Sequence, residues 1–495
     1  MRPYFCPVQG VSIAHDGKNW HSGIGEGFDR KGRITVTPNG FAYLALALWP
    51  IVTILIFMRF PPGRAVIISL LAGYLLLPPP PAQFDLPLVP MLNKESIASL
   101  CTLITAFMIH GRHIRLLPDN LIAKGLLIAL VLSPVLTALT NGDAVINGAF
   151  YIQPLGLKEG VSMALNNAIM VIPFILAYNF LSTAKDQRDI LIAFLVGGLA
   201  YSLPMLLEVR LSPQMNTWVY GYFQHSFDQM MRGGGFRPIV FLQHGLWVAF
   251  FAMMSVLAAF TLFKTDRTRD PKTYLMAGAY LLVVLVLCKS LGALIFALAL
   301  IPVILFFSIK TQVRLALVLM LISLTYPVLK GNDLLPQAAI LEQAYSISPE
   351  RGQSLEFRLV NEALLLDRAQ HKPVFGWGTF GRSLVHDQTG RLLTIPDGRW
   401  VIVFGAFGWV GYIAEFGLLA LSGFLLWRRA IVSQTTVKVA PWMGGLVLIL
   451  GINMIDMLPN ATLTPLTWMI SGAVMGYAMS FQKVRRSRPR LQSAL

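Results

Sequence analysis

The stretch FAYLALALWPIVTILIFMR, residues 41–59, carries no charged side chain before its final Arg59. An α-helix rises about 1.5 Å per residue, so a run of this length reaches across the roughly 30 Å hydrocarbon core of a bilayer. Lipid offers the backbone no hydrogen-bond partner, and a helix satisfies its own backbone groups. The stretch therefore predicts a transmembrane helix.

Comparable apolar runs recur along most of the chain. Of its 495 residues, 55% are hydrophobic and only 13% are charged, whereas about 25% are charged in an average soluble domain. We therefore expect an all-α polytopic membrane protein with about 12–13 transmembrane helices. The expected spans are 41–59, 64–80, 96–111, 120–140, 161–182, 189–208, 239–263, 274–288, 290–308, 312–329, 400–427, 440–458 and 462–481.

The basic residues are unevenly distributed between the loops that join these spans. The formal net charge is +16, and 21 basic residues fall in loops or ends on one side of the membrane. They are Arg59, Arg64, Arg112, Arg115, Lys124, Lys185, Arg188, Lys264, Arg267, Arg269, Lys272, Lys310, Arg314, Arg428, Arg429, Lys438 and the five within 483–490. By the positive-inside rule this side is cytoplasmic, which places the C-terminus inside and the N-terminus outside. The charge therefore indicates topology and not a nucleic-acid partner.

The predicted organisation has five parts. They are a polar tail at 1–40, ten spans within 41–329, a large periplasmic loop at 330–399, three spans within 400–481 and a basic cytoplasmic tail at 482–495. The polar tail has two interpretations, a disordered segment or sequence upstream of a translation start near Val36. It lacks the short apolar core of a cleavable signal peptide, so the first span is expected to direct insertion.

The large loop contains GWGTFG, residues 376–381, which fits the G-x-G-x-x-G spacing of a dinucleotide-binding turn. That spacing indicates a nucleotide site only after a buried strand and before a helix. No strand is expected before Gly376, so these glycines are expected to form a tight turn. Upstream, residues Ser354 to Gln370 have apolar side chains at helical spacing and predict an amphipathic surface helix with Ser354 as its N-cap.

A second informative segment is YGYFQHSFDQMMRGGGFRPIVFLQHGLW, residues 220–247. It places Arg232, Arg237, His225 and His244 around three consecutive glycines. A single arginine at the mouth of an apolar helix is usually an interfacial anchor. Several basic residues in an outer loop go against the positive-inside rule, and this favours a functional site.

Several catalytic motifs are absent from the sequence, namely H-E-x-x-H, G-x-x-x-x-G-K-[ST], G-x-S-x-G and Asp-x-Asp. The last of these is the usual carboxylate pair for a divalent ion on a diphosphate. Cys6, Cys101 and Cys288 are too far apart to indicate a disulfide framework or a metal site. We therefore expect no cofactor, and a bound diphosphate would be held by arginine, whose planar fork pairs with phosphate oxygens.

Three elements follow one another in a recognisable order: Arg358 on the expected amphipathic helix, then KPVFGWGTFGR, then DGRWVIVFGAFGWVGYIAEFGLLAL from Asp397. This order resembles the C-terminal signature of the O-antigen ligase and polymerase family. In that family an arginine-bearing helix, a PlfGxGxg turn and a segment ending E-x-G-L-L flank the large periplasmic loop. The upstream EVRLSP, YGYF and RGGGFRPIVFLQHGL are similar to the version in exopolysaccharide polymerases. The resemblance is loose over residues 41–480 and specific at 208–247 and 354–421.

The resemblance implies a GT-C-like glycosyltransferase of the bacterial inner membrane that acts at the periplasmic face. Its donor would be a polyprenyl-pyrophosphate-linked oligosaccharide, and its acceptor a hydroxyl of a glycan or of the lipid A core. Polymerisation of exopolysaccharide or O-antigen repeats is favoured over ligation, because ligases usually carry a His-Asn pair where this sequence has Asp397-Gly398-Arg399-Trp400. Membrane lipid and proteins of polysaccharide export or chain-length control are further expected partners.

The resemblance implies that Arg237 and Arg358, with Arg232 as a third candidate, bind the pyrophosphate. The sequence departs from the family where a general base is expected, and the candidates for that role are Asp397 first, then His386 and His244. Trp377, Tyr220 and Trp400 could stack on sugar rings. The structural alternatives are a helix N-cap or turn residue for Asp397, a satisfied buried carboxylate for Glu415 in the next span, and interfacial anchors for the aromatic residues.

Two other classes of function remain open. A lipid-linked oligosaccharide flippase or other transporter of this size often has repeated halves with broken helices, and no such internal symmetry is visible. A membrane scaffold for an export complex would leave the outer arginines without a role.

Overall fold

The computed structural model describes residues 27–28, 34–35, 37–86, 90–111, 114–148, 150–232, 234–429 and 439–487. The chain divides into two units, residues 1–37 and 38–495. In the first unit the described part is a two-stranded antiparallel hairpin of β1 (Gly27–Phe28) and β2 (Ile34–Thr35). The alternatives for the N-terminal tail, and most of the predicted C-terminal tail, lie outside the described residues.

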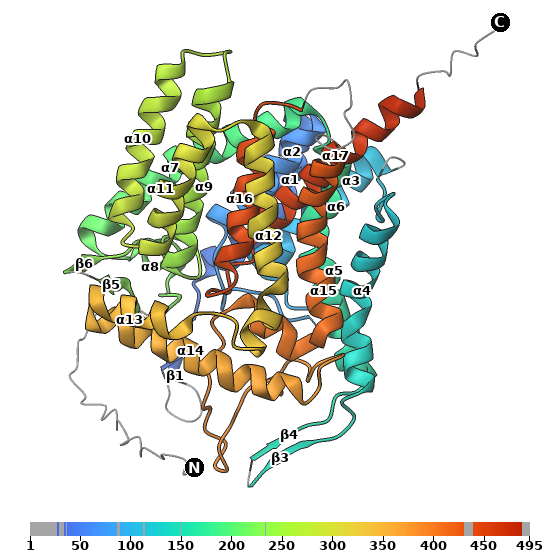
Figure 1. The fold of residues 1–495 in the computed structure, drawn as a ribbon, viewed down its shortest axis with the longest axis vertical. Coiled ribbons are helices and arrows are strands. Elements are labelled where there is room, and N and C mark those ends of the chain that lie inside the picture. Colours follow the sequence, from blue (N-terminus) through green and yellow to red (C-terminus); the bar gives the residue numbers. More distant parts are fainter. Residues whose placement is uncertain are drawn as a thin grey trace, which may run out of the picture. The chain divides into compact units, whose positions relative to one another are not determined.

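Each of the thirteen predicted spans coincides with a helix or a pair of helices in the second unit (Figure 1). These are α1 (Gly40–Arg59), α2 (Pro62–Leu76), α3 (Lys94–His110), α4 (Leu121–Leu139), α5 (Leu157–Met170) with α6 (Ile172–Phe180), α7 (Ala184–Leu211), α9 (Gly245–Thr265), α10 (Pro271–Leu287), α11 (Leu291–Phe306), α12 (Ile309–Gly331), α15 (Arg399–Trp427), α16 (Met443–Asp456) and α17 (Pro465–Ser487). The prediction of an all-α architecture is confirmed.

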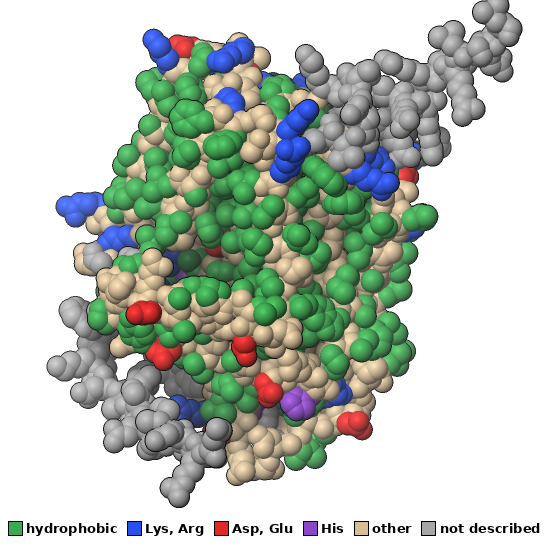
Figure 2. Space-filling model, in the orientation of Figure 1, with side chains coloured by type: hydrophobic (Ala, Val, Ile, Leu, Met, Phe, Trp, Pro, Cys, Tyr) green, Lys and Arg blue, Asp and Glu red, His purple; other side chains and the backbone are tan. Residues whose placement is uncertain are grey.

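The helices are long and apolar enough to identify a multi-pass membrane protein. Within the described residues, seven helical segments of at least 18 residues have the hydropathy of membrane spans. They are Gly40–Arg59, Leu121–Leu139, Leu157–Phe180, Ala184–Leu211, Gly245–Thr265, Ile309–Gly331 and Arg399–Trp427. α9 is the most deeply buried of these, with 83% of its apolar window inside the protein, so it lies at the centre of the bundle. Apolar side chains cover much of the visible face of the bundle (Figure 2).

Successive helices place alternate loops at the same end of the bundle, and we term the end that carries residues 332–398 the loop end. Polar contacts join its loops: Lys94 Nζ donates to the Phe241 carbonyl, and Asn141 Nδ2 donates to the Gly376 carbonyl. Two helices, α13 (Gln337–Ile347) and α14 (Pro349–Gln370), lie across this end (Figure 1). Small elements here are β3 (Val145–Asn147), β4 (Phe150–Ile152), α8 (Met215–Tyr220), η2 (Phe227–Met230), β5 (Met231–Arg232) and β6 (Gly235–Phe236).

The predicted amphipathic helix exists, but its start was placed too late. α14 begins at Pro349, so the prediction that Ser354 is the N-cap is wrong. Proline is well suited to a first helical position because the missing N–H has no partner there in any case. The short helix α13 was not predicted, and none of its residues is buried.

The GWGTFG turn packs backbone to backbone against a break in α15. Gly376 and Gly408 both have positive φ, and a Cβ on either would come within 2.5 Å of the other segment's backbone. Trp377 N–H donates to the Gly405 carbonyl, and Trp409 N–H donates to the Pro373 carbonyl. No strand precedes Gly376 in this fully described region, so the glycines form a turn, as expected, and the dinucleotide interpretation fails.

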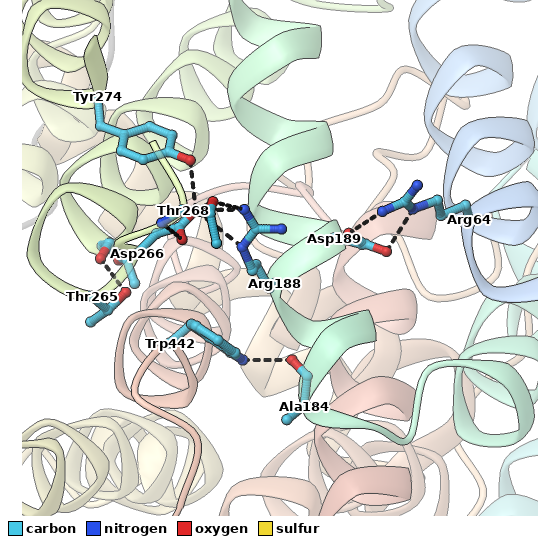
Figure 3. A network of polar contacts seen from close by, with 10 residues as sticks. Arg64, Ala184, Arg188, Asp189, Thr265, Asp266, Thr268, Tyr274 and Trp442 are labelled. Atoms are coloured by element: carbon cyan, nitrogen blue, oxygen red, sulfur yellow. Dashed lines mark hydrogen bonds and ion pairs between the residues drawn. The ribbon is translucent and has the colours of Figure 1, made fainter. Parts of the chain in front are cut away.

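Two ion pairs join helices at the opposite end of the bundle (Figure 3). Arg64 of α2 pairs with Asp189 of α7 at 2.8 Å, and Arg188 pairs with Asp266 at 2.7 Å. Asp266 also accepts hydrogen bonds from Tyr274 and Thr268. Burial alone would raise the pKa of Asp266, but the hydrogen bonds from Arg188, Tyr274 and Thr268 together outweigh burial and hold the pKa below its usual range. The contacts fasten α2, α7, α9 and α10 together.

Candidate functional site

The glycine-rich segment before α9 folds into a hairpin. Met231 pairs with Phe236 and Arg232 with Gly235, and Gly234 takes the positive φ that the tight turn requires. Lys289, in the short link between α10 and α11, donates through Nζ to the Arg232 carbonyl at 2.7 Å. The hairpin thereby carries the Arg232 side chain to the rim of the loop end.

The residues that follow this hairpin are not helical, although the prediction began a span at residue 239. The buried Glu208 carboxylate accepts the N–H groups of Ile239 and Val240 at 2.7 and 2.8 Å, while Lys94 holds the Phe241 carbonyl at 2.7 Å. Val240 has φ of 50°, a strained conformation for a β-branched residue. These side chains replace the helical hydrogen bonds, and α9 starts only at Gly245.

Arg237 lies in this clamped segment, and its side chain is 1% exposed. None of its three guanidinium nitrogens has a hydrogen-bond partner among the residues that the structure describes. Burial, together with the nearby charges of Arg232 and Arg358, lowers its pKa to about 10, so it is still charged at neutral pH. A buried cation without a partner is unfavourable by several kcal/mol, and an anion placed beside it would offset that penalty.

Arg358 and Asp397 meet across the loop end from α14 and from the segment before α15. Arg358 Nε lies 3.4 Å from Asp397 Oδ2, and both side chains are about one-third exposed. The N-cap of α15 is Gly398, so Asp397 is not the N-cap; it lies in the non-helical segment directly before the helix. A partly exposed pair at this distance is weak, so an anion can displace Asp397 from Arg358.

Arg232, His244, Arg358 and Asp397 line one cavity of about 630 Å³, which we term the polar cavity. Its other polar lining residues are Gln224, His225, Gln229, Gln243, Ser354, Asn460 and Thr462. A neighbouring apolar cavity of about 1010 Å³ shares Arg232, Ser354 and Arg358 with it. The apolar cavity is lined by side chains of α10, α11, α13 and α14, among them Val286, Leu291, Leu294, Ile347 and Leu355. Two arginines therefore stand where a polar and an apolar cavity meet.

His244 is held as a neutral imidazole. Its Nδ1 accepts the Leu246 N–H at 2.9 Å and caps α9, and its ring lies 4.6 Å from that of His225. Burial, reinforced by the positive charges of Arg237, Arg232 and Arg358, lowers its pKa to about 3. With Nδ1 occupied, the remaining proton is on Nε2, so His244 can donate a hydrogen bond but is poorly suited to act as a base. The geometry favours Asp397 for that role.

Five other sequence candidates lie away from the polar cavity. His386 forms an isolated bridge with Leu392, and its carbonyl accepts from Asn147 Nδ2. The rings of Tyr220 and Trp400 are buried, with their polar groups bonded to Leu76 and Glu362. Trp377 lies under the Arg368 guanidinium, 3.5 Å from its ring centroid, and donates to the Arg368 carbonyl. Glu415 forms a two-point pair with Arg399, which confirms the alternative of a satisfied carboxylate.

Sequence reasoning missed the groups that position the site. Glu208 and Lys94 fix the segment of Arg237 and His244, and the loop of residues 457–464 forms one wall of the polar cavity. A charge at the end of an apolar helix was the only signal for Glu208 and Lys94. The wall residues Asn460 and Thr462 have no local signature.

Comparison with models of known protein families finds no match for this chain, and comparison with curated proteins finds none. The function is therefore inferred from the site.

Proposed function

We propose that the protein is an inner-membrane glycosyltransferase that polymerises polyprenyl-pyrophosphate-linked oligosaccharide repeats, with its loop end facing the periplasm. The observation that carries the proposal is Arg237, a buried guanidinium without a hydrogen-bond partner in the described chain, close to two further arginines. Arg232 and Arg358 line the polar cavity, and the buried Arg237 lies near enough for both charges to lower its pKa. Such a cluster of cations suits a ligand with two or more negative charges.

The paired cavities suit an amphiphilic anion. Arg232 and Arg358 stand at the junction, where they would hold the pyrophosphate. The apolar cavity would take the first isoprene units of the carrier, because its lining is largely aliphatic. The polar cavity, rich in amide and hydroxyl side chains, would take the sugars next to the pyrophosphate.

The chemistry requires one proton transfer and one leaving group. A hydroxyl of the acceptor glycan attacks the anomeric carbon of the donor, and Asp397 accepts the hydroxyl proton. The bond between the anomeric carbon and the pyrophosphate oxygen breaks, and the electron pair leaves with the polyprenyl pyrophosphate. The arginines stabilise the charge that develops on this leaving group. Binding of the pyrophosphate to Arg358 also releases Asp397 from its ion pair.

The test uses the purified full-length protein in lipid with the host's polyprenyl-linked repeat unit and resolves the glycolipids by size. A ladder spaced by one repeat, persisting in excess chelator, supports the proposal. A single shift that needs lipid A would identify a ligase instead. An intact donor under both conditions would refute transfer, and a flux assay would then test the flippase alternative.

A further inference from the structure

A third cavity lies between the start of α3, the C-terminal end of α5 and the start of α17. Its volume is about 200 Å³, and it is lined by Glu95, Ser99, Asn166, Met170, Thr464 and Trp468 among others. None of the roles assigned above uses these side chains.

Two buried polar atoms in this lining have no partner among the described residues. They are Oε1 of Glu95, an acceptor, and Nε1 of Trp468, a donor. The Trp468 side chain is 1% exposed, so water outside the protein cannot satisfy its N–H. An unsatisfied buried polar group is unfavourable, because it has lost its hydrogen bonds to water without gaining others. A ligand that offers both a hydroxyl donor and a hydroxyl acceptor would satisfy both.

The lining also restricts the class of ligand. The Glu95 carboxylate disfavours an anion, and the Trp468 N–H disfavours a metal ion, which needs acceptors only. Met170, Ile169, Leu463 and the indole ring supply an apolar wall. A pyranose combines a C–H face with a rim of hydroxyl groups, and the volume suits a single ring. We propose that this cavity binds one sugar unit of the acceptor glycan, an inference that rests on the proposed function.

The cavity is well placed for an acceptor because one loop separates it from the polar cavity. Asn460 and Thr462 face the polar cavity, and Leu463 and Thr464 of the same loop face the third cavity. Arg399, two residues after Asp397, connects this loop with α5. Its backbone N–H donates to the carbonyls of Met457 and Asn460, and its side chain lies 3.5 Å from Met170 Sδ. An acceptor sugar held here would extend past this loop toward Asp397.

Saturation-transfer NMR on the full-length protein in nanodiscs tests binding, with the carrier-free repeat-unit oligosaccharide as the probe. Trp468→Phe keeps an aromatic side chain but removes the indole N–H, and Glu95→Gln removes the acceptor charge. Each is expected to weaken binding about tenfold, the weight of one hydrogen bond. Asn166→Phe plugs the cavity from an exposed position and should lower the signal strongly, whereas Leu165→Phe places a phenylalanine at the neighbouring exposed position and should not.

Equal saturation in wild type and Asn166→Phe, or no saturation in wild type, would overturn the proposal. The acceptor KM in the ladder assay separates this failure from that of the proposed function. If the wild type forms a ladder and the acceptor KM is unchanged in Trp468→Phe and Asn166→Phe, the third cavity does not bind the acceptor. The proposal that the protein is a transferase would then still stand. If wild type makes no ladder, the transferase itself fails, and with it the assignment of the cavity to an acceptor.

Discussion

Replacing Arg237 with methionine should stabilise the protein while abolishing its activity. Burial lowers the pKa of Arg237 well below its ordinary value, to about 10, in the folded protein. At about 1.36 kcal/mol per pH unit, the protonated side chain opposes folding by about 3 kcal/mol at neutral pH. The unfolded chain holds this proton more tightly, so the penalty is complete below pH 10 and disappears only as the pH approaches the ordinary pKa of arginine. Methionine fills similar space and removes the charge.

Arg382→Met is the matched control. Arg382 is equally buried and also lies at the loop end, but its guanidinium donates to the carbonyls of Trp377, Gln153 and Asp143 at 2.7–3.1 Å. Its loss leaves those acceptors unsatisfied, so this variant should lose several kcal/mol.

The assay is thermal or denaturant unfolding of both variants in one detergent, beside the glycolipid ladder. We expect Arg237→Met to unfold at or above the wild-type midpoint and to form no ladder, and Arg382→Met to unfold well below it. If Arg237→Met is destabilised as strongly as Arg382→Met, the Arg237 guanidinium stabilises the fold and is not a group kept unpaired to bind an anion.

Three further outcomes are expected. Arg358→Ala should insert normally into the membrane but form no product. Asp397→Asn should lower transfer roughly 10²–10⁴-fold yet keep or strengthen pyrophosphate binding, because Arg358 loses its competing partner. If both variants lose donor affinity equally, the two residues do not have separate roles. NMR of His244 should show no titration between pH 5 and 8, because its pKa is about 3, and a midpoint near 6.5 would contradict its burial as a neutral cap. Asp266→Asn should destabilise the protein by about 3–5 kcal/mol, because it leaves Arg188 unpaired. The pKa of Asp266 is depressed in the folded protein, so the stability that its carboxylate contributes is present at neutral pH and lost as the pH falls below about 4. A variant whose stability falls with acid as steeply as that of the wild type would contradict this role.

The positions of the helices could be predicted because the signal is local. About twenty consecutive apolar residues require a helix in lipid, whatever surrounds them. Turn chemistry is local too: Gly376 needs a positive φ, and no strand precedes it. The helix start at Ser354 was misplaced, because several residues of α14 could begin a helix and the sequence alone does not choose between them.

The grouping of Arg232, Arg358, His244 and Asp397 around one cavity depends on contacts between distant parts of the chain. The hydrogen bond from Lys94 to Phe241, for example, spans 147 residues. The sequence also did not predict that Tyr220 and Trp400 are buried, or that His386 lies away from the cavity. By itself the sequence determined which segments form apolar helices and which residue types were available for chemistry, because hydropathy and backbone preference act over one or two helical turns. Only the tertiary structure decided which charges meet and which are left without a partner, because that depends on how the helices pack.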